Sequence, residues 1–239
     1  MKRALKHVKH MLKTPPPRAK PARARPRELP EDTRTRILDA AERLFAEQGV
    51  DAVSVRAVLR EAGVNGALAN YHFGSREGLI AELLRSRVAP LAEAQLRAIE
   101  EVDSRGDATL EDVLRAYMAP AARALGAEPH LGRLLGQLGL SASPAVRELG
   151  RDVLRASIRR LSEALVKRLA GPLDPARLLV RLYMVIGIPS FFASSWEVVA
   201  QSARKHLPGT ALDATVMAEE FVAFTAAGLR AAPSAAQEE

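Results

Sequence analysis

The sequence predicts an all-α protein of about nine helices. Apolar residues recur at a spacing of three or four in every strong segment after residue 30, which is the period of an amphipathic helix. No segment alternates apolar and polar residues with the period of two that marks a β-strand, and no internal repeat is present. Serine, threonine or aspartate precedes several apolar segments, often with proline or an acid soon after it, as is typical of helix starts.

Residues 1–30 differ from the rest of the chain and are expected to form a flexible arm. They contain ten Lys and Arg residues and one acid, Glu28, so their net charge is +9. Residues 31–239 contain 25 basic and 27 acidic side chains and are almost neutral. Six prolines between residues 14 and 30 favour extended chain over a packed core. A basic arm can attract nucleic-acid phosphates without reading sequence, and the alternative is a solubilising tail.

The segment 54–73 has the pattern of a helix-turn-helix. Ser54 is a good N-cap for a first short helix, and Gly63 can end that helix in the left-handed conformation. Asn65 can cap a second short helix over residues 66–72. In a helix-turn-helix the second helix enters the major groove of DNA. An ordinary helical hairpin in an all-α core is the alternative interpretation of the same pattern.

The other helices are expected, in order, over residues 31–48, 76–102, 110–121, 129–140, 144–171, 175–196 and 211–230. Proline should kink the helix over 76–102 at Pro90, bend the next at Pro120, and interrupt the helix over 175–196 at Pro189. The chain is thereby divided into the arm 1–30, an N-terminal three-helix domain 31–86 that contains the helix-turn-helix, and a helical domain 87–232.

Few features of the sequence support catalysis. The chain has no cysteine, hence no disulfide and no thiolate metal ligand. Its five histidines show no H-x-x-x-H or H-E-x-x-H spacing, and neither G-x-S-x-G nor the phosphate-binding G-x-x-x-x-G-K-[ST] occurs. We therefore predict no catalytic residue, no metal site and no cofactor. No apolar run is expected to approach the roughly eighteen residues of a membrane span, which predicts a soluble protein without a membrane partner. The absence of cysteine favours a reducing cytoplasm.

Side chains in and beside the predicted second helix suit contact with DNA. Asn70 can pair bidentately with adenine, and Arg56 can reach a guanine or a phosphate. Gly66 and Ala67 are small enough to admit close approach of the DNA. Two other functions remain open from the residues alone: a sequence-blind DNA-packing protein that uses the basic arm, and an enzyme housed in the C-terminal helical body. The packing protein would bind weakly and with a steep salt dependence.

The N-terminal third resembles the tetracycline-repressor (TetR) family of bacterial transcriptional regulators. The resemblance extends from Arg34 to about Leu84 and rests on three blocks in order: R-x-x-I-L-D-A-A-E-R-L-F-A-E-Q-G, S-V-R-A-V-L-R-E-A-G-V-N and N-Y-H-F-G-S-R-E-G-L-I. It implies three DNA-binding helices followed by a ligand-binding and dimerising domain. It also implies a homodimer that represses from a palindromic double-stranded DNA operator, in the bacterial cytoplasm at the nucleoid, and is released by a small-molecule effector.

The same resemblance assigns the DNA-contact positions. They are Ser54, Arg56, Gly66, Ala67, Leu68, Asn70, Tyr71, His72 and Arg76, and the turn residue Asn65 completes the predicted set. Many members have tyrosine where this chain has Asn70, and serine or threonine where it has Asn65. The block V-N-G-A-L-A-N-Y-H-F-G-S, with Pro90-Leu91 further on, is similar to a branch that includes fatty-acid-responsive regulators. An apolar or acyl-type effector is therefore expected.

The ligand and dimer surfaces can be sketched from apolar residues in the C-terminal domain. The candidates for an apolar ligand cavity are Met118, Leu134, Leu138, Phe192 and Trp196. The candidates for an acidic or polar head group are Arg115, Tyr117, His130, Arg133, Gln137 and Arg181. The helices over 175–197 and 211–230 are expected to form the dimer, because the second of them has more apolar surface than one buried stripe requires.

Overall fold

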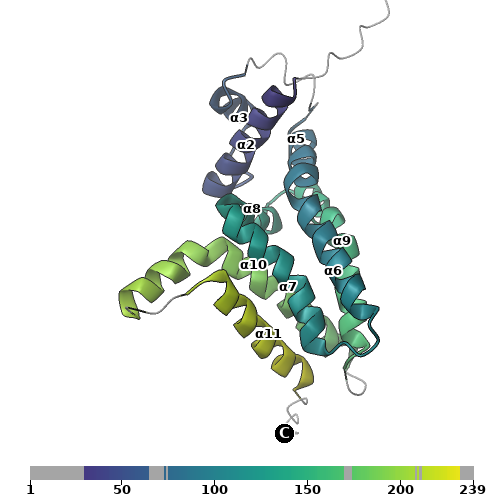
Figure 1. The fold of residues 1–239 in the computed structure, drawn as a ribbon. Coiled ribbons are helices and arrows are strands. Elements are labelled where there is room, and N and C mark those ends of the chain that lie inside the picture. Colours follow the sequence, from purple (N-terminus) through teal and green to yellow (C-terminus); the bar gives the residue numbers. More distant parts are fainter. Residues whose placement is uncertain are drawn as a thin grey trace, which may run out of the picture.

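The computed structural model describes residues 30–64, 73, 75–169, 174–207, 209 and 212–231, and the regular structure among these residues is helical with no strand. The elements are α2 (Glu31–Gln48), α3 (Val55–Glu61), α5 (Arg76–Leu83), the π-helix η1 (Leu84–Val88), α6 (Ala89–Asp103), α7 (Leu110–Ala127), α8 (Pro129–Leu140), α9 (Pro144–Val166), α10 (Pro175–His206) and α11 (Ala214–Arg230). The all-α prediction is confirmed. Helices α2 and α3 lie at one end of the molecule, and α6, α7, α9, α10 and α11 form the bundle below them (Figure 1).

Side-chain caps fix most helix starts, as the sequence pattern indicated. In each case a side-chain oxygen accepts a backbone N–H of the first turn, which is otherwise without a partner. Thr109 and Asp112 form a reciprocal capping box at the start of α7. The other caps are Ser54 for α3, Ser75 for α5, Ser143 for α9, Asp174 for α10 and Asp213 for α11.

Two prolines act differently from one another in the long helices. Helices α5 and α6 form one continuous rod through η1, where the N–H of Ala89 reaches back five residues to the carbonyl of Leu84. The π-turn lies directly before Pro90, which has no N–H and crowds the carbonyl four residues earlier. The expected interruption at Pro189 is wrong: α10 continues through this buried proline to His206. Proline removes one hydrogen bond of the helix, and the bonds on either side maintain it.

The buried residues form two clusters. The N-terminal cluster joins α2, α3, α5 and η1 to residues of α8 and α9, among them Leu131, Leu134 and Leu138 of α8. The second cluster joins α6, α7, the end of α9, α10 and α11. Helix α8 therefore belongs to the core of the predicted DNA-binding unit, although it follows residue 86 in the chain. It also packs against α10.

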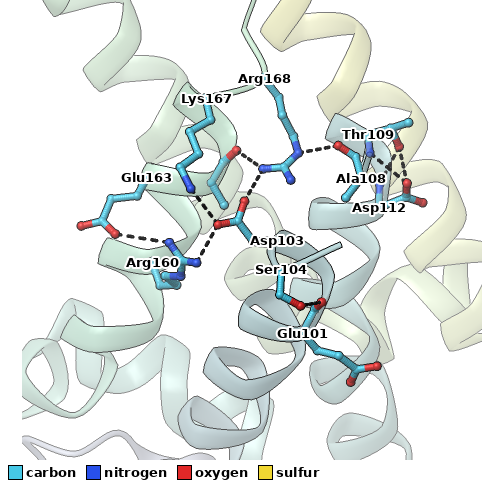
Figure 2. A network of polar contacts seen from close by, with 11 residues as sticks. Glu101, Asp103, Ser104, Ala108, Thr109, Asp112, Arg160, Glu163, Lys167 and Arg168 are labelled. Carbon is cyan, nitrogen blue, oxygen red and sulfur yellow. Dashed lines mark hydrogen bonds and ion pairs between the residues drawn. The ribbon is translucent and has the colours of Figure 1, made fainter. Parts of the chain in front are cut away.

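A buried carboxylate fastens the turn between α6 and α7 to the end of α9 (Figure 2). Asp103 accepts hydrogen bonds from Arg160 at 2.6 Å, Lys167 at 2.9 Å and Arg168 at 2.7 Å, and its side chain is only 4% exposed. Arg168 also donates to the carbonyl of Ala108. The hydrogen bonds from Lys167 and Arg168 hold the pKa of Asp103 well below its usual value, so the carboxylate stays ionised and all three cations remain bound to it.

Helix α10 exposes an unusual amount of apolar surface. Its exposed large apolar residues are Leu179, Val180, Tyr183, Met184, Phe191 and Val198. By length and composition alone α10 is apolar enough to cross a membrane, which corrects the expectation that no run approaches such a length. Apolar side chains of α11 divide between two environments, since Phe221 is buried in the second cluster whereas Phe224 is 71% exposed.

Candidate DNA-binding surface and effector cavity

The predicted DNA-reading helix falls outside the residues that the structure describes. Seven of the ten predicted contact positions lie there: Asn65, Gly66, Ala67, Leu68, Asn70, Tyr71 and His72. The structure does describe the frame on either side of them. Helix α2 and α3 precede the predicted reading helix and pack on each other, and α5 follows it and packs on α2.

Helix α3 presents basic side chains to solvent. Arg56 and Arg60 are both exposed and lie one turn apart, so they share one side of the helix. Ser54 is exposed beside them, and its hydroxyl oxygen accepts the N–H of Ala57 at 3.2 Å. That bond uses an acceptor lone pair and leaves the hydroxyl hydrogen available for a phosphate oxygen.

Arg76 is held within the protein. Its guanidinium donates to the carbonyl of Val50 and lies 3.6 Å from the carboxylate of Asp51. Asp51 also accepts hydrogen bonds from the backbone N–H of Ala142 at 2.5 Å and the hydroxyl of Ser141 at 2.8 Å. These hydrogen bonds lower the pKa of Asp51, and the bond from Ala142 has the largest effect. The loop between α8 and α9 is thereby joined to the loop between α2 and α3 and to the start of α5.

The start of α5 has a tight backbone arrangement that requires glycine. Ser75 caps the helix by accepting the N–H of Gly78 at 3.0 Å. A Cβ atom at Gly78 would lie 1.9 Å from the carbonyl oxygen of Phe73, so no other residue fits without a shift of the backbone. Backbone N–H groups at the start of such a helix can bind a phosphate, as we expect of a helix that follows the reading helix.

A second joint connects α2 to η1. Arg87 forms an ion pair with Asp39 and lies 3.0 Å from the carboxylate of Glu42. Burial raises the pKa of Glu42, and Arg87 opposes that rise. The pairing fixes the position of α2 against the long α5–α6 rod.

A largely apolar cavity of about 460 Å³ lies between α7, α10 and α11. The described residues that line it are Met118, Ile188, Pro189, Phe192, Trp196, Val199, Leu212, Val216, Met217, Glu220, Phe221 and Phe224. Three of the five predicted ligand residues, Met118, Phe192 and Trp196, are on this wall. Leu134 and Leu138 are not, because both pack in the N-terminal cluster. The sequence alone did not single out the α11 side of the wall, where Glu220 lies.

The residues considered for an acidic head group do not line this cavity. Arg115 pairs with Asp112 at 3.1 Å, and Arg133 lies 3.3 Å from both Glu197 and His130. Tyr117 is buried, and burial raises its pKa to about 12.

The remaining two head-group candidates also have their contacts elsewhere. Arg181 donates to the carbonyls of Leu229 and Ala231 at the end of α11. Gln137 lies beside Gly49, its amide oxygen 3.2 Å from the place where a Cβ would be. Within the described part of the chain, no group of three or more His, Asp or Glu is placed to hold a metal ion.

Comparison with known proteins agrees with this arrangement. Residues 37–83 match the family described as bacterial regulatory proteins, tetR family. The HTH-type transcriptional regulator BetI of Rhizobium meliloti is 37% identical over 67 residues, which is 28% of this chain and 33% of BetI. The HTH-type transcriptional regulator AcrR of Shigella flexneri is 25% identical over 180 residues, 72% of this chain and 81% of AcrR.

The whole fold also has solved counterparts. The transcriptional regulator FadR from Bacillus subtilis, solved in complex with stearoyl-CoA, superposes with a TM-score of 0.63 at 17% identity, over 81% of this chain and 98% of FadR. The helix-turn-helix frame, together with these relatives, defines a DNA-binding transcriptional regulator. Residues 37–83 thus match the TetR family, and the longer chain has the fold of solved regulators of that family.

Proposed function

We propose that this regulator is a repressor that binds a palindromic operator as a homodimer and is released by a small molecule held between α7, α10 and α11. The observation that carries the proposal is the position of α8. This helix contributes Leu131, Leu134 and Leu138 to the core of the DNA-binding unit, and it packs against α10, one wall of the cavity. Any ligand that displaces α10 therefore also displaces α8, and α8 is part of the core of the DNA-binding unit.

Polar contacts near the two ends of α8 connect it to the DNA-binding unit and to α10. Near its C-terminus, Ser141 and Ala142 hold Asp51, and Asp51 lies beside Arg76 at the start of α5. At its N-terminal end, Arg133 lies 3.3 Å from Glu197 of α10. In a two-fold dimer the reading helices must be about 34–36 Å apart to enter successive major grooves. A small rotation of α8 in each subunit changes that separation and lowers operator affinity.

The proposed dimer surface is the outer face of α10 with part of α11. Val180, Met184, Phe191 and Val198 follow one another at intervals of four, seven and seven residues, so they form one stripe along α10. The residues that line the cavity from α10 lie on a different side of the helix. An exposed apolar stripe of this length is stabilised when a second copy covers it, and identical stripes related by a two-fold axis cover each other. This explains the apolar character of α10 without a membrane.

An apolar molecule suits the cavity, whose walls are almost entirely aliphatic and aromatic. The FadR structure shows that this fold can hold an acyl-CoA. We keep the sequence-based expectation of an apolar or acyl-type molecule for the body of the effector. The chemistry of its polar end is taken up below.

The proposal is tested by selecting bound sites from random double-stranded DNA with the purified full chain. We expect an enriched palindrome, and we expect Arg56→Ala to weaken binding to it while Arg36→Ala, on the exposed start of α2, leaves binding within about twofold. Binding that enriches no sequence and falls steeply with salt would instead show a DNA-packing protein.

A further inference from the structure

We infer that the cavity between α7, α10 and α11 takes an amphipathic cation, and that Glu220 is its counter-charge. The inference rests on the proposed function for its regulatory meaning, and on the cavity alone for its chemistry. Glu220 is the one charged residue among the described residues that line the cavity. It lies on α11 and is exposed, so its carboxylate stands at the rim, where a charged group of the ligand can remain partly hydrated.

The walls beneath Glu220 suit a large apolar body. Four aromatic rings line them, those of Phe192, Trp196, Phe221 and Phe224. The face of an aromatic ring attracts a cation and repels an anion, and this attraction grows as water is excluded. The side chains of Met118 and Phe221 are only 1% and 5% exposed, so the inner part of the wall is apolar and little exposed to water.

An anionic ligand has no comparable partner in this cavity. No Arg, Lys or His is among the described lining residues, so nothing there can pair with a carboxylate or phosphate. The arginines nearby are engaged elsewhere: Arg133 contacts Glu197, and Arg181 donates to the backbone carbonyls of Leu229 and Ala231. An anion placed at the rim would be repelled by Glu220 and would lose hydration without replacement.

The test uses two probes of nearly equal size and shape and opposite charge, tetraphenylphosphonium and tetraphenylborate. Binding to the full-length wild-type chain is measured by equilibrium dialysis, and independently by the fluorescence of Trp196, which is the chain's one tryptophan and lies in the cavity wall. We expect tetraphenylphosphonium to bind with a change in Trp196 fluorescence and to be preferred over tetraphenylborate.

The variant Glu220→Gln separates charge from shape. A partly exposed ion pair is worth up to about 1 kcal/mol, so we expect affinity for the cation to fall about fivefold and affinity for the anion to rise by a similar factor. Glu219→Gln is the matched control, because Glu219 is its exposed neighbour on α11 and does not line the cavity. The control should leave both affinities unchanged.

Four results would overturn the inference. Three concern the probes: no binding of tetraphenylphosphonium, equal or tighter binding of tetraphenylborate to wild type, or a Glu220→Gln variant that binds both probes as wild type does. Cation binding that occurs only by splitting a dimer, seen as a smaller sedimentation coefficient, would also overturn it, since a second copy would then be the occupant. Release from the operator is measured separately. If the cation binds in a Glu220-dependent way but does not release the protein from the operator, the inference is supported and the proposed function is contradicted. If a neutral compound releases the protein from the operator and no cation binds, the proposed function is supported and the inference is contradicted.

Discussion

Replacing Phe191 by serine should dissociate the proposed dimer while leaving the fold of each chain intact. Phe191 is 63% exposed on α10, so its ring contributes little to the core of its own chain. Its ring meets that of Phe192 edge-on, with centroids 5.9 Å apart, and Phe192 itself is retained in the variant. The loss should therefore fall on the contact with the second copy.

The magnitude follows from the exposed area. A phenylalanine that is fully covered buries about 200 Å², and with 63% of Phe191 exposed about 130 Å² is available to a partner. At about 25 cal/mol per Å² this is about 3 kcal/mol per copy, and two-fold symmetry counts it twice. Association costs reduce the part that is realised, so we take half, about 3 kcal/mol in total. The dissociation constant of the dimer should rise at least about 100-fold.

Sedimentation velocity over a range of protein concentrations measures this change directly. Leu140→Ser is the control, because Leu140 is 83% exposed on α8, away from the stripe of α10. We expect the control to sediment as wild type and the Phe191→Ser variant to remain monomeric at concentrations where wild type is dimeric. Far-ultraviolet circular dichroism should show equal helix content in all three proteins. A Phe191→Ser variant that dimerises as tightly as wild type would refute the assignment of this surface.

Three further outcomes are expected. Asn70→Ala should cost roughly 1–3 kcal/mol of binding free energy on the best operator and less on altered sites, measured by binding titration. An equal loss of affinity on all sequences would instead make Asn70 a phosphate contact. Deleting residues 1–30, which carry +9, should weaken DNA binding and reduce its salt dependence without changing base preference, whereas an unchanged salt slope would leave the segment as a solubility tail. Asp103→Asn should lower the free energy of unfolding near pH 7 by about 2 kcal/mol in denaturant titrations, because it breaks a largely buried ion-pair cluster. The pKa of Asp103 is held below 3.8 in the folded state, so its ionised carboxylate stabilises the fold above that pH and stabilises it less as the pH falls. The free energies of unfolding of wild type and variant should therefore converge in acid. A difference between them that is constant with pH would contradict this.

Local patterns in the sequence predicted the helices well, because the signals that start a helix are themselves local. Ser54, Thr109, Ser143 and Asp174 were all recognisable as N-caps, and each accepts a backbone N–H of the first turn in the structure. Pro90 was expected to kink its helix, and a π-turn precedes it. The extension of α10 through Pro189 was missed, since the cost of proline in a helix can be offset by tertiary burial that no local pattern reveals.

The face that each helix buries could not be predicted where apolar residues surround the helix. On α11, Phe221 and Phe224 are equivalent by composition, yet one is buried and the other is exposed. A charge at Phe221 would therefore damage the fold, so only exposed positions such as Phe191 can test the dimer. Leu134 and Leu138 were expected at the ligand, but helix α8 turns them toward the DNA-binding unit.

Charged contacts between distant helices were also beyond the sequence. Arg160 lies in the last two turns of α9, and Lys167 and Arg168 directly follow its end, so the sequence places the three cations in one short segment. That they all meet Asp103 depends on how α6 and α9 cross. In the same way, Arg76 was expected at DNA by resemblance, and its contacts with Val50 and Asp51 depend on a loop 25 residues away in the chain.

The stoichiometry of the complex on a selected operator tests the central claim most directly. The full-length chain would be mixed with a duplex that carries the whole enriched palindrome, and with one that carries a single half-site, and the mass of each complex measured by native mass spectrometry. We predict two chains on the palindrome, no stable complex with one chain, and much weaker binding to the half-site, because each dimer reads two successive major-groove segments. A tight complex of one chain with one duplex, equally stable on the half-site, would contradict the account.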